Sequence, residues 1–93
     1  MPALRNRFRQ ALLDRTPTFG AWMQIAHPAG AEIFGRLGFD WICVDLEHGA
    51  IDLEGAAAIF RAAEAQGAVA MARLPFNDTI WIKRTLDAGA RGL

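Results

Sequence analysis

The chain has 93 residues, of which 53% are hydrophobic and 22% are charged, and ten Lys and Arg residues balance ten Asp and Glu residues. This composition excludes a disordered chain and a basic nucleic-acid-binding domain, and it favours one small globular unit that acts on a small molecule. No apolar stretch approaches the roughly 20 residues that span a bilayer, and the N-terminal segment is unlike a signal peptide, so we expect no membrane association.

Hydrophobic periodicity predicts an amphipathic opening helix and then a first strand–helix unit. Over Ala3–Leu13 the apolar residues recur at helical spacing with arginines between them, and these arginines form a solvated face. The apolar run Thr18–Ile25 predicts a strand, because prolines flank it on both sides. Pro28 then begins a helix that extends through Leu37 and ends at Gly38.

The same strand–helix pattern occurs twice more along the chain. It predicts a strand over Trp41–Val44, a helix from its cap Asp52 to about Gln66, a strand over Val69–Leu74, and a helix that Asn77 or Asp78 caps and Gly89 ends. Cys43, the only cysteine, lies inside the second strand, so an internal disulfide is excluded. A lone cysteine in an apolar run favours a cytoplasmic protein with a small core thiol.

Three strand–helix units in succession require a parallel sheet, because each helix returns the chain to the same edge. Arg91–Leu93 is typical of the approach to a fourth strand. A closed (β/α)8 barrel takes roughly 250 residues. We therefore predict that residues 1–93 are the N-terminal part of a (β/α)8 TIM barrel, truncated before the fourth strand. A complete three-stranded α/β domain is the alternative, but it leaves two unprotected edges.

Polar side chains follow each predicted strand, where the carboxyl ends of parallel strands meet at one rim. Gln24 and His27 follow the first strand. His48 follows the second, and its unperturbed pKa near 6.5 suits a general base at neutral pH. The alternative is a histidine that packs or is solvated in its loop. Asn77 and Asp78 fit turn and cap chemistry, and we assign them no catalytic role.

Two carboxylates stand beside His48. Asp45 and Glu47 are two residues apart, so in an extended segment they point the same way and offer oxygen ligands for a divalent metal ion or for its surroundings. A solvated acidic loop is an equally good interpretation.

Arg73 ends the third strand, and its guanidinium suits a carboxylate or an enolate oxygen. The alternative is an internal salt bridge to Asp45 or Glu47. Trp22 in the first strand either belongs to the core, which is more common for a lone Trp, or walls a pocket. Asp87 lies in the last turn of a predicted helix, where the helix dipole disfavours a carboxylate. It is either exposed and tolerated, or needed by something outside its helix.

In order and spacing, five sequence elements resemble the metal-dependent (class II) pyruvate aldolases of the HpcH/HpaI family, which include 4-hydroxy-2-oxoheptanedioate and 2-dehydro-3-deoxyglucarate aldolases. They are Gly20-Ala21-Trp22, Gly38-Phe39-Asp40-Trp41, Asp45-Leu46-Glu47-His48-Gly49, Arg73-Leu74-Pro75 with Asn77-Asp78, and Ile82-Lys83-Arg84 through Leu86-Asp87-Ala88-Gly89. The resemblance implies a (β/α)8 barrel that cleaves 4-hydroxy-2-oxo acids to pyruvate and an aldehyde through a metal-stabilised enolate.

By the same resemblance, His48 is the base and Arg73 binds the 2-oxo acid, with Trp22 beside the substrate. Asp87 raises the basicity of the histidine from a neighbouring subunit, so a homo-oligomer with its active site near a subunit interface is implied. The divalent metal ion (Mg, Mn or Co) takes a glutamate and an aspartate from later strands, beyond residue 93. The 93 residues alone are therefore expected to be inactive. A citrate-lyase-type acyl-CoA lyase and a non-catalytic oxo-acid binding or assembly module are the alternatives.

Overall fold

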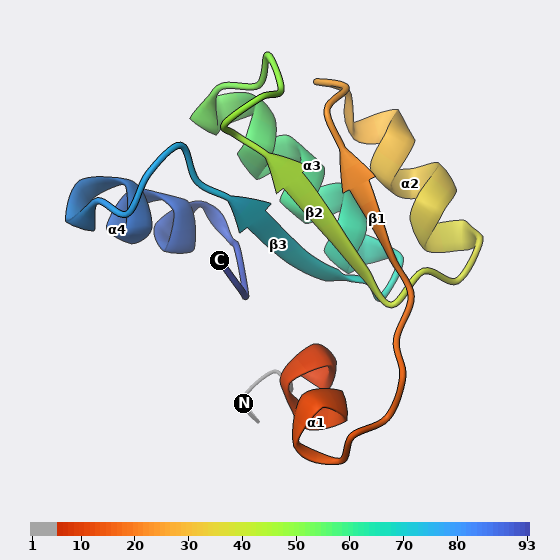
Figure 1. The fold of residues 1–93 in the computed structure, drawn as a ribbon. Coiled ribbons are helices and arrows are strands. Elements are labelled where there is room, and N and C mark those ends of the chain that lie inside the picture. The colour runs from red at the N-terminus through yellow and green to blue at the C-terminus, as the bar shows by residue number, and fades with distance from the viewer. Residues whose placement is uncertain (1–5) are drawn as a thin grey trace.

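The computed structural model describes residues 6–93, which form a parallel sheet with helices packed against it (Figure 1). The elements, in chain order, are α1 (Arg7–Leu13), β1 (Gly20–Met23), α2 (Pro28–Arg36), β2 (Trp41–Asp45), α3 (Leu53–Ala65), β3 (Val69–Arg73) and α4 (Thr79–Ala88). The predicted sequence of an opening helix and three strand–helix units is confirmed.

The strands follow the order β1-β2-β3, and both pairings are parallel. The predicted approach to a fourth strand lies along the free edge of β3, where Gly92 forms a parallel bridge with Met71. There the Arg91 amide donates to the Ala70 carbonyl at 2.7 Å, and the Ala72 amide donates to the Gly92 carbonyl at 3.1 Å. The sheet therefore continues past β3 in the same direction.

The two faces of the sheet have different surroundings. Helices α2 and α3 cover one face, whereas none of the helices within residues 6–93 covers the face toward the viewer in Figure 1. The covered face supplies strand residues to the core, namely Ala21, Met23, Ile42, Val44, Ala70 and Ala72. The residues between them point the other way, and Trp22, Cys43 and Met71 stand in one row across that open face.

Two predicted elements need correction by two or more residues, and two strand ends differ by one residue, because β2 ends at Asp45 rather than Val44 and β3 at Arg73 rather than Leu74. The opening helix begins at Arg7 rather than Ala3, because Asn6 is extended and its side chain accepts from the Arg9 amide at 3.0 Å; the predicted part over 3–5 lies outside the described residues. The first strand is Gly20–Met23 rather than 18–25. Its apolar run continues at both ends into residues that lie outside the sheet and are largely exposed, Phe19 and Ile25.

The predicted helix ends are confirmed. Asp52 caps α3 by accepting from the Gly55 amide at 2.8 Å, and Asp78 caps α4 by accepting from the Trp81 amide at 3.0 Å. The glycines that end the three later helices all adopt positive φ: Gly38, Gly67 and Gly89. Within residues 6–93, no helix is both long and apolar enough to cross a membrane.

Helix α1 lies beneath the amino-terminal ends of the strands (Figure 1). The Phe8 ring meets the Trp41 ring edge-on with 5.8 Å between centroids. Arg7 donates to the Gly67 carbonyl, and the Asn6 amide group donates to the Arg91 carbonyl at 3.0 Å. These contacts close one end of the sheet, so the opposite end, where the carboxyl ends of the strands lie, is the one open to a ligand.

Candidate active site

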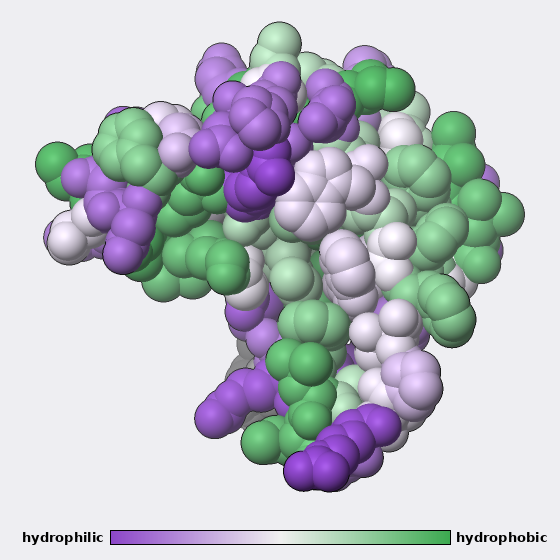
Figure 2. Space-filling model, in the orientation of Figure 1, coloured by the Kyte–Doolittle hydropathy of each residue, from purple (hydrophilic) through white to green (hydrophobic). Residues whose placement is uncertain are grey.

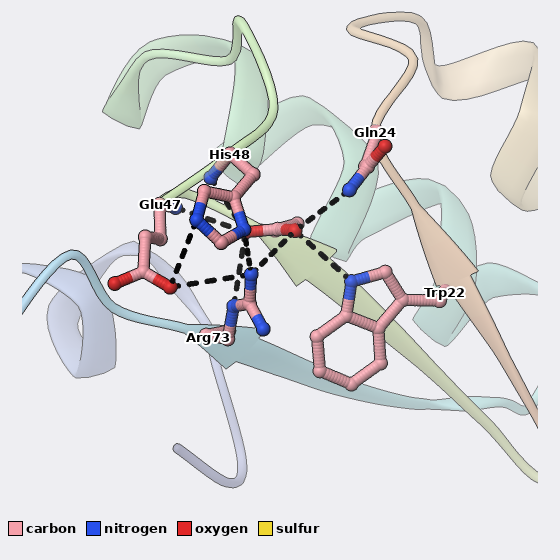
Figure 3. A network of polar contacts seen from close by, with 6 residues as sticks. Trp22, Gln24, Glu47, His48 and Arg73 are labelled. Carbon is pink, nitrogen blue, oxygen red and sulfur yellow. Dashed lines mark hydrogen bonds and ion pairs between the residues drawn. The ribbon is translucent and has the colours of Figure 1, made fainter.

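A network of polar side chains gathers at the carboxyl ends of the strands (Figure 3). Asp45 ends β2 and Arg73 ends β3, and the two are direct partners in the sheet register. Trp22 reaches the same place from β1, and Glu47 and His48 come from the turn after β2. Figure 2 shows hydrophilic side chains gathered over this end of the sheet, above a more apolar face.

Asp45 is the centre of the network and has no exposed surface. Its Oδ2 accepts from Trp22 Nε1 at 3.1 Å and from Gln24 Nε2 at 2.9 Å. Its Oδ1 accepts from the backbone amides of Glu47 at 3.0 Å and His48 at 2.9 Å. This one carboxylate therefore ties β1 to the turn that carries the histidine.

Burial and hydrogen bonding act on the Asp45 carboxyl in opposite directions. Burial works to raise its pKa, because it disfavours the charged form. Hydrogen bonds from the His48 amide, Gln24 and Trp22 favour the charged form, and they hold the pKa of Asp45 well below its usual range. The buried carboxylate is therefore ionised at neutral pH.

The chain turns sharply after Asp45, so the expectation of an extended segment is wrong. The Gly49 amide donates to the Asp45 carbonyl at 3.2 Å, which closes the turn. A Cβ at Gly49 would lie 2.4 Å from that carbonyl oxygen, so only glycine fits there. Asp45 consequently points into the protein, whereas the Glu47 side chain is 38% exposed.

Arg73 binds both carboxylates, as the alternative interpretation of this residue predicted. Its Nε lies 3.3 Å from Asp45 Oδ1, and its Nη2 lies 3.3 Å from Asp45 Oδ2 and 3.2 Å from Glu47 Oε1. The guanidinium carbon also lies 5.4 Å from the centroid of the Trp22 ring, within cation–π range. These contacts hold the guanidinium in one place, and its side chain remains 37% exposed to a ligand.

His48 is the most exposed member of the ion-paired group, at 64% of its side chain. Its Nδ1 accepts a hydrogen bond from Arg73 Nη2, because arginine is only a donor. Its Nε2 therefore carries the proton when the ring is neutral, and this atom faces Glu47 Oε1 at 3.5 Å. The structure thus places the candidate base beside the candidate anion-binding arginine.

The residues present do not fit a divalent metal ion. Among residues 6–93 there is no group of three or more His, Cys, Asp or Glu side chains placed to hold one. Both oxygens of Asp45 already accept from N–H donors, and Glu47 faces Arg73. Direct ligation of a metal ion, one interpretation of the sequence, is therefore contradicted for Asp45, Glu47 and His48.

An open hollow of about 660 Å³ adjoins the network on the uncovered face of the sheet. Trp22, Cys43 and Met71 line it from the strands, and Phe76 lines it from the loop after β3. Burial, and then the charge of Asp45, raise the pKa of the Cys43 thiol to about 11. This thiol is therefore protonated at neutral pH, and the predicted burial of Cys43 is confirmed, because this residue is 3% exposed.

The two remaining candidate residues are Trp22, on the open face of the sheet, and Asp87, at the end of α4. Trp22 is 48% exposed and stands outside the core between sheet and helices, so the core interpretation is wrong. Asp87 is exposed in the last turn of α4, and no contact between its side chain and the network occurs among the described residues.

The role of Gln24 was missed in the sequence. Its position just after β1 marked it as a rim residue, but nothing in the sequence showed that its amide would reach Asp45. His27, marked in the same way, caps α2 by accepting from the Ala29 amide at 3.0 Å. One of the two rim positions after β1 therefore joins the network, and the other is structural.

Known proteins resemble this chain over nearly its whole length. The family model for HpcH/HpaI aldolase/citrate lyase matches residues 18–93. A hydroxypyruvate/pyruvate aldolase of Agrobacterium fabrum is 41% identical over 93 residues, which are 100% of this chain and 35% of that protein. The structure of an HpcH/HpaI aldolase/citrate lyase family protein from Burkholderia cenocepacia superposes with a TM-score of 0.86 at 34% identity, covering 94% of this chain and 35% of that one.

A citrate synthase structure is also similar, with a TM-score of 0.84 at 32% identity over 90% of this chain and 34% of the other. The chain therefore spans about a third of the length of the relatives that it matches.

Proposed function

Because this chain belongs to the HpcH/HpaI aldolase/citrate lyase family, we propose that it forms the opening part of a (β/α)8 barrel aldolase. The reaction is cleavage of a 4-hydroxy-2-oxo acid to pyruvate and an aldehyde. The observation that supports this proposal most directly is the contact between Arg73 and His48 at the carboxyl ends of β2 and β3. In this proposal Arg73, which lines the open hollow, binds the anion, and the adjacent His48 acts as the base.

The chemistry needs both groups. His48 takes the proton from the C4 hydroxyl, and the electron pair of that bond forms the aldehyde carbonyl as the C3–C4 bond breaks. The electrons of the broken bond pass to the C2 oxygen and give the enolate of pyruvate. Arg73 donates hydrogen bonds to the enolate oxygen, and protonation at C3 then releases pyruvate. Trp22 forms an apolar wall of the same hollow and positions the substrate.

The divalent metal ion implied by the family resemblance requires ligands from outside residues 6–93, because the donors in this region are already paired. When bound, the metal ion would polarise the 2-oxo acid and stabilise the enolate, so turnover would require it. We accordingly expect no turnover from the 93-residue chain alone, with or without added Mg²⁺ or Mn²⁺. Retro-aldol assays on 4-hydroxy-2-oxo acids measure this directly.

Asp87 is assigned to a site shared between subunits. The carboxylate is exposed at the end of α4, where the helix dipole disfavours it and no described residue pairs with it. A neighbouring copy in a homo-oligomer would bring it to His48. The free thiol of Cys43 is consistent with the cytoplasm as the compartment.

A chimera tests the proposal. Residues 18–93 would replace the matching segment of the Agrobacterium fabrum aldolase, and pyruvate release from 4-hydroxy-2-oxopentanoate would be followed with lactate dehydrogenase. We expect pyruvate formation that depends on added Mg²⁺ or Mn²⁺. A folded chimera without turnover would contradict the assignment. Mixing His48→Ala and Asp87→Ala chimeras would restore part of the activity only if the site is shared between subunits.

The similarity to a citrate synthase favours a second candidate, a lyase that acts on acyl-coenzyme A. The hollow and the arginine suit any enolate, so they do not separate the two reactions. The same chimera, assayed with acetyl-coenzyme A and oxaloacetate, distinguishes them. Turnover of these substrates in place of the hydroxy-oxo acid would favour the second candidate.

A further inference from the structure

Arg73 has two carboxylate partners that differ in how firmly they are held. Asp45 is fully buried and its oxygens accept hydrogen bonds from β1 and from the turn, so it cannot leave. Glu47 is 38% exposed, and its carboxylate contacts only Arg73 and His48 among the polar groups of the described residues. Glu47 is therefore the partner that a ligand can displace.

The position of the Glu47 carboxylate resembles that of a bound anion. A single oxygen, Oε1, lies 3.2 Å from Arg73 Nη2 and 3.5 Å from His48 Nε2. These are the two groups to which the proposed function assigns the substrate. In this arrangement the Arg73 hydrogen bond also occupies His48 Nδ1, so the neutral ring has no free acceptor for a substrate proton.

We propose that Glu47 occupies the place of a substrate oxygen on Arg73 and His48 in the ligand-free chain, and thereby sets the affinity of the site for the anion. This inference rests on the proposed function. Binding of the 2-oxo acid then swings Glu47 outward and redirects Arg73 to the ligand, which frees Nδ1 of His48. Glu47 acts on the affinity of the site for the anion and not on the bond-breaking step, so it is a binding residue and not a catalytic one.

The energetic requirement is modest. An exposed ion pair contributes little, so its loss on ligand binding lowers affinity by a factor of up to about five. Replacing Glu47 with glutamine removes this competition and the repulsion between two anions. We therefore expect Glu47→Gln to tighten anion binding by about three- to fivefold.

The chain contains a matched control. Glu64 pairs with Arg91 at 2.8 Å, and the two side chains are 39% and 37% exposed, values close to those of Glu47 and Arg73. This pair lies at the other end of the sheet, beside α1. Glu64→Gln changes the net charge by the same amount, so it separates local competition from a general effect of charge.

The test uses the 93-residue chain, labelled with nitrogen-15 and titrated with oxalate, a planar anion that resembles the enolate of pyruvate. Ring signals of His48 report binding, and His27, the other histidine, provides a reference away from the site. We expect tighter oxalate binding for Glu47→Gln and unchanged binding for Glu64→Gln.

Three results would overturn the inference: equal or weaker binding by Glu47→Gln, equal tightening by both variants, or no oxalate binding by any chain. The chimera assay is independent of these results. If Glu47→Gln does not tighten binding but the chimera is active, only the role of Glu47 fails. If binding tightens but the chimera is inactive, the anion site remains and the aldolase assignment fails.

Discussion

The two faces of the sheet are built from alternate residues of the same three strands, yet one packs against helices and the other carries the polar network. Ile42 and Val44 face the helices and have no exposed surface, whereas Cys43 and Asp45, which alternate with them, face the open side. On the covered face the residues are apolar and small enough to pack. On the open face, at its carboxyl end, they are polar and paired. Stability and chemistry are thus separated by a one-residue step along each strand.

The difference shows where the polar network can be tolerated. Asp45 is as buried as Ile42, but it lies in the last position of its strand, where the turn provides free backbone amides. Two residues earlier on the same face, burial and then the charge of Asp45 raise the pKa of the Cys43 thiol to about 11, so it stays protonated at neutral pH. The hydrogen bonds available at the rim therefore allow this buried carboxylate to stay charged.

The largest expected effect is on the open face, at His48. In the active chimera, His48→Ala should lower the turnover of the hydroxy-oxo acid by about 100- to 10,000-fold, because general base catalysis is lost. The control is His27→Gln, which alters a helix cap instead. Steady-state kinetics measure both, and similar losses in the two variants would refute a special role for His48.

The next effect is on the covered face, at Ile42. Ile42→Ala should lower the free energy of unfolding of the 93-residue chain by about 2–5 kcal/mol, because it removes buried apolar contacts and leaves a cavity that the neighbouring side chains fill only in part. Met71→Ala, which truncates a residue on the open face, should cost less. Urea denaturation followed by circular dichroism gives both values. Equal losses would mean that the two faces contribute equally to stability.

Asp45 gives a smaller effect with a defined pH dependence. All its neighbours are donors, so the amide of Asp45→Asn would place an N–H group against another donor, at a cost of about 1–3 kcal/mol at pH 7. The folded pKa lies below the unfolded value of about 3.9. The unfolded chain therefore binds more protons at low pH, and this contribution is lost as the pH falls below about 4.

Urea denaturation at pH 3 and pH 7 measures this dependence. The difference between wild type and Asp45→Asn should shrink at pH 3, whereas Asp87→Asn, at an exposed carboxylate, should show a small difference at both values. A constant difference for Asp45→Asn would show that the hydrogen bonds do not favour the charged form.

The sequence allowed the scaffold to be predicted better than the contacts at the site. The helix ends could be predicted because their signals are local: Asp52 and Asp78 at the N-caps, and glycines at the carboxyl ends. The rim position of Asp45 and Arg73 followed from parallel topology. The place of Trp22 did not, because Ala21, Trp22 and Met23 are all apolar and show no alternation that would assign faces.

Which side chains pair at the rim was also beyond the sequence. For Arg73, a ligand and an internal carboxylate were equally compatible with its position, and the structure shows the carboxylates. The turn after β2 explains why: it turns Asp45 inward and leaves Glu47 outside, and this depends on the close approach at Gly49. Such backbone geometry has no periodic signature.

The smallest predicted effect concerns a buried hydroxyl in α4, a helix that packs against α3. Thr85 in α4 has no exposed surface, and its hydroxyl is the only buried side-chain donor or acceptor without a partner in the part of the chain that the structure describes. Thr85→Val keeps the shape and removes the unsatisfied group, so it should leave the free energy of unfolding unchanged or raise it by up to about 1 kcal/mol. Urea denaturation measures the change, with Thr85→Ala as the control that also removes volume. A clear loss of stability in the valine variant would mean that the Thr85 hydroxyl forms a hydrogen bond that stabilises the fold.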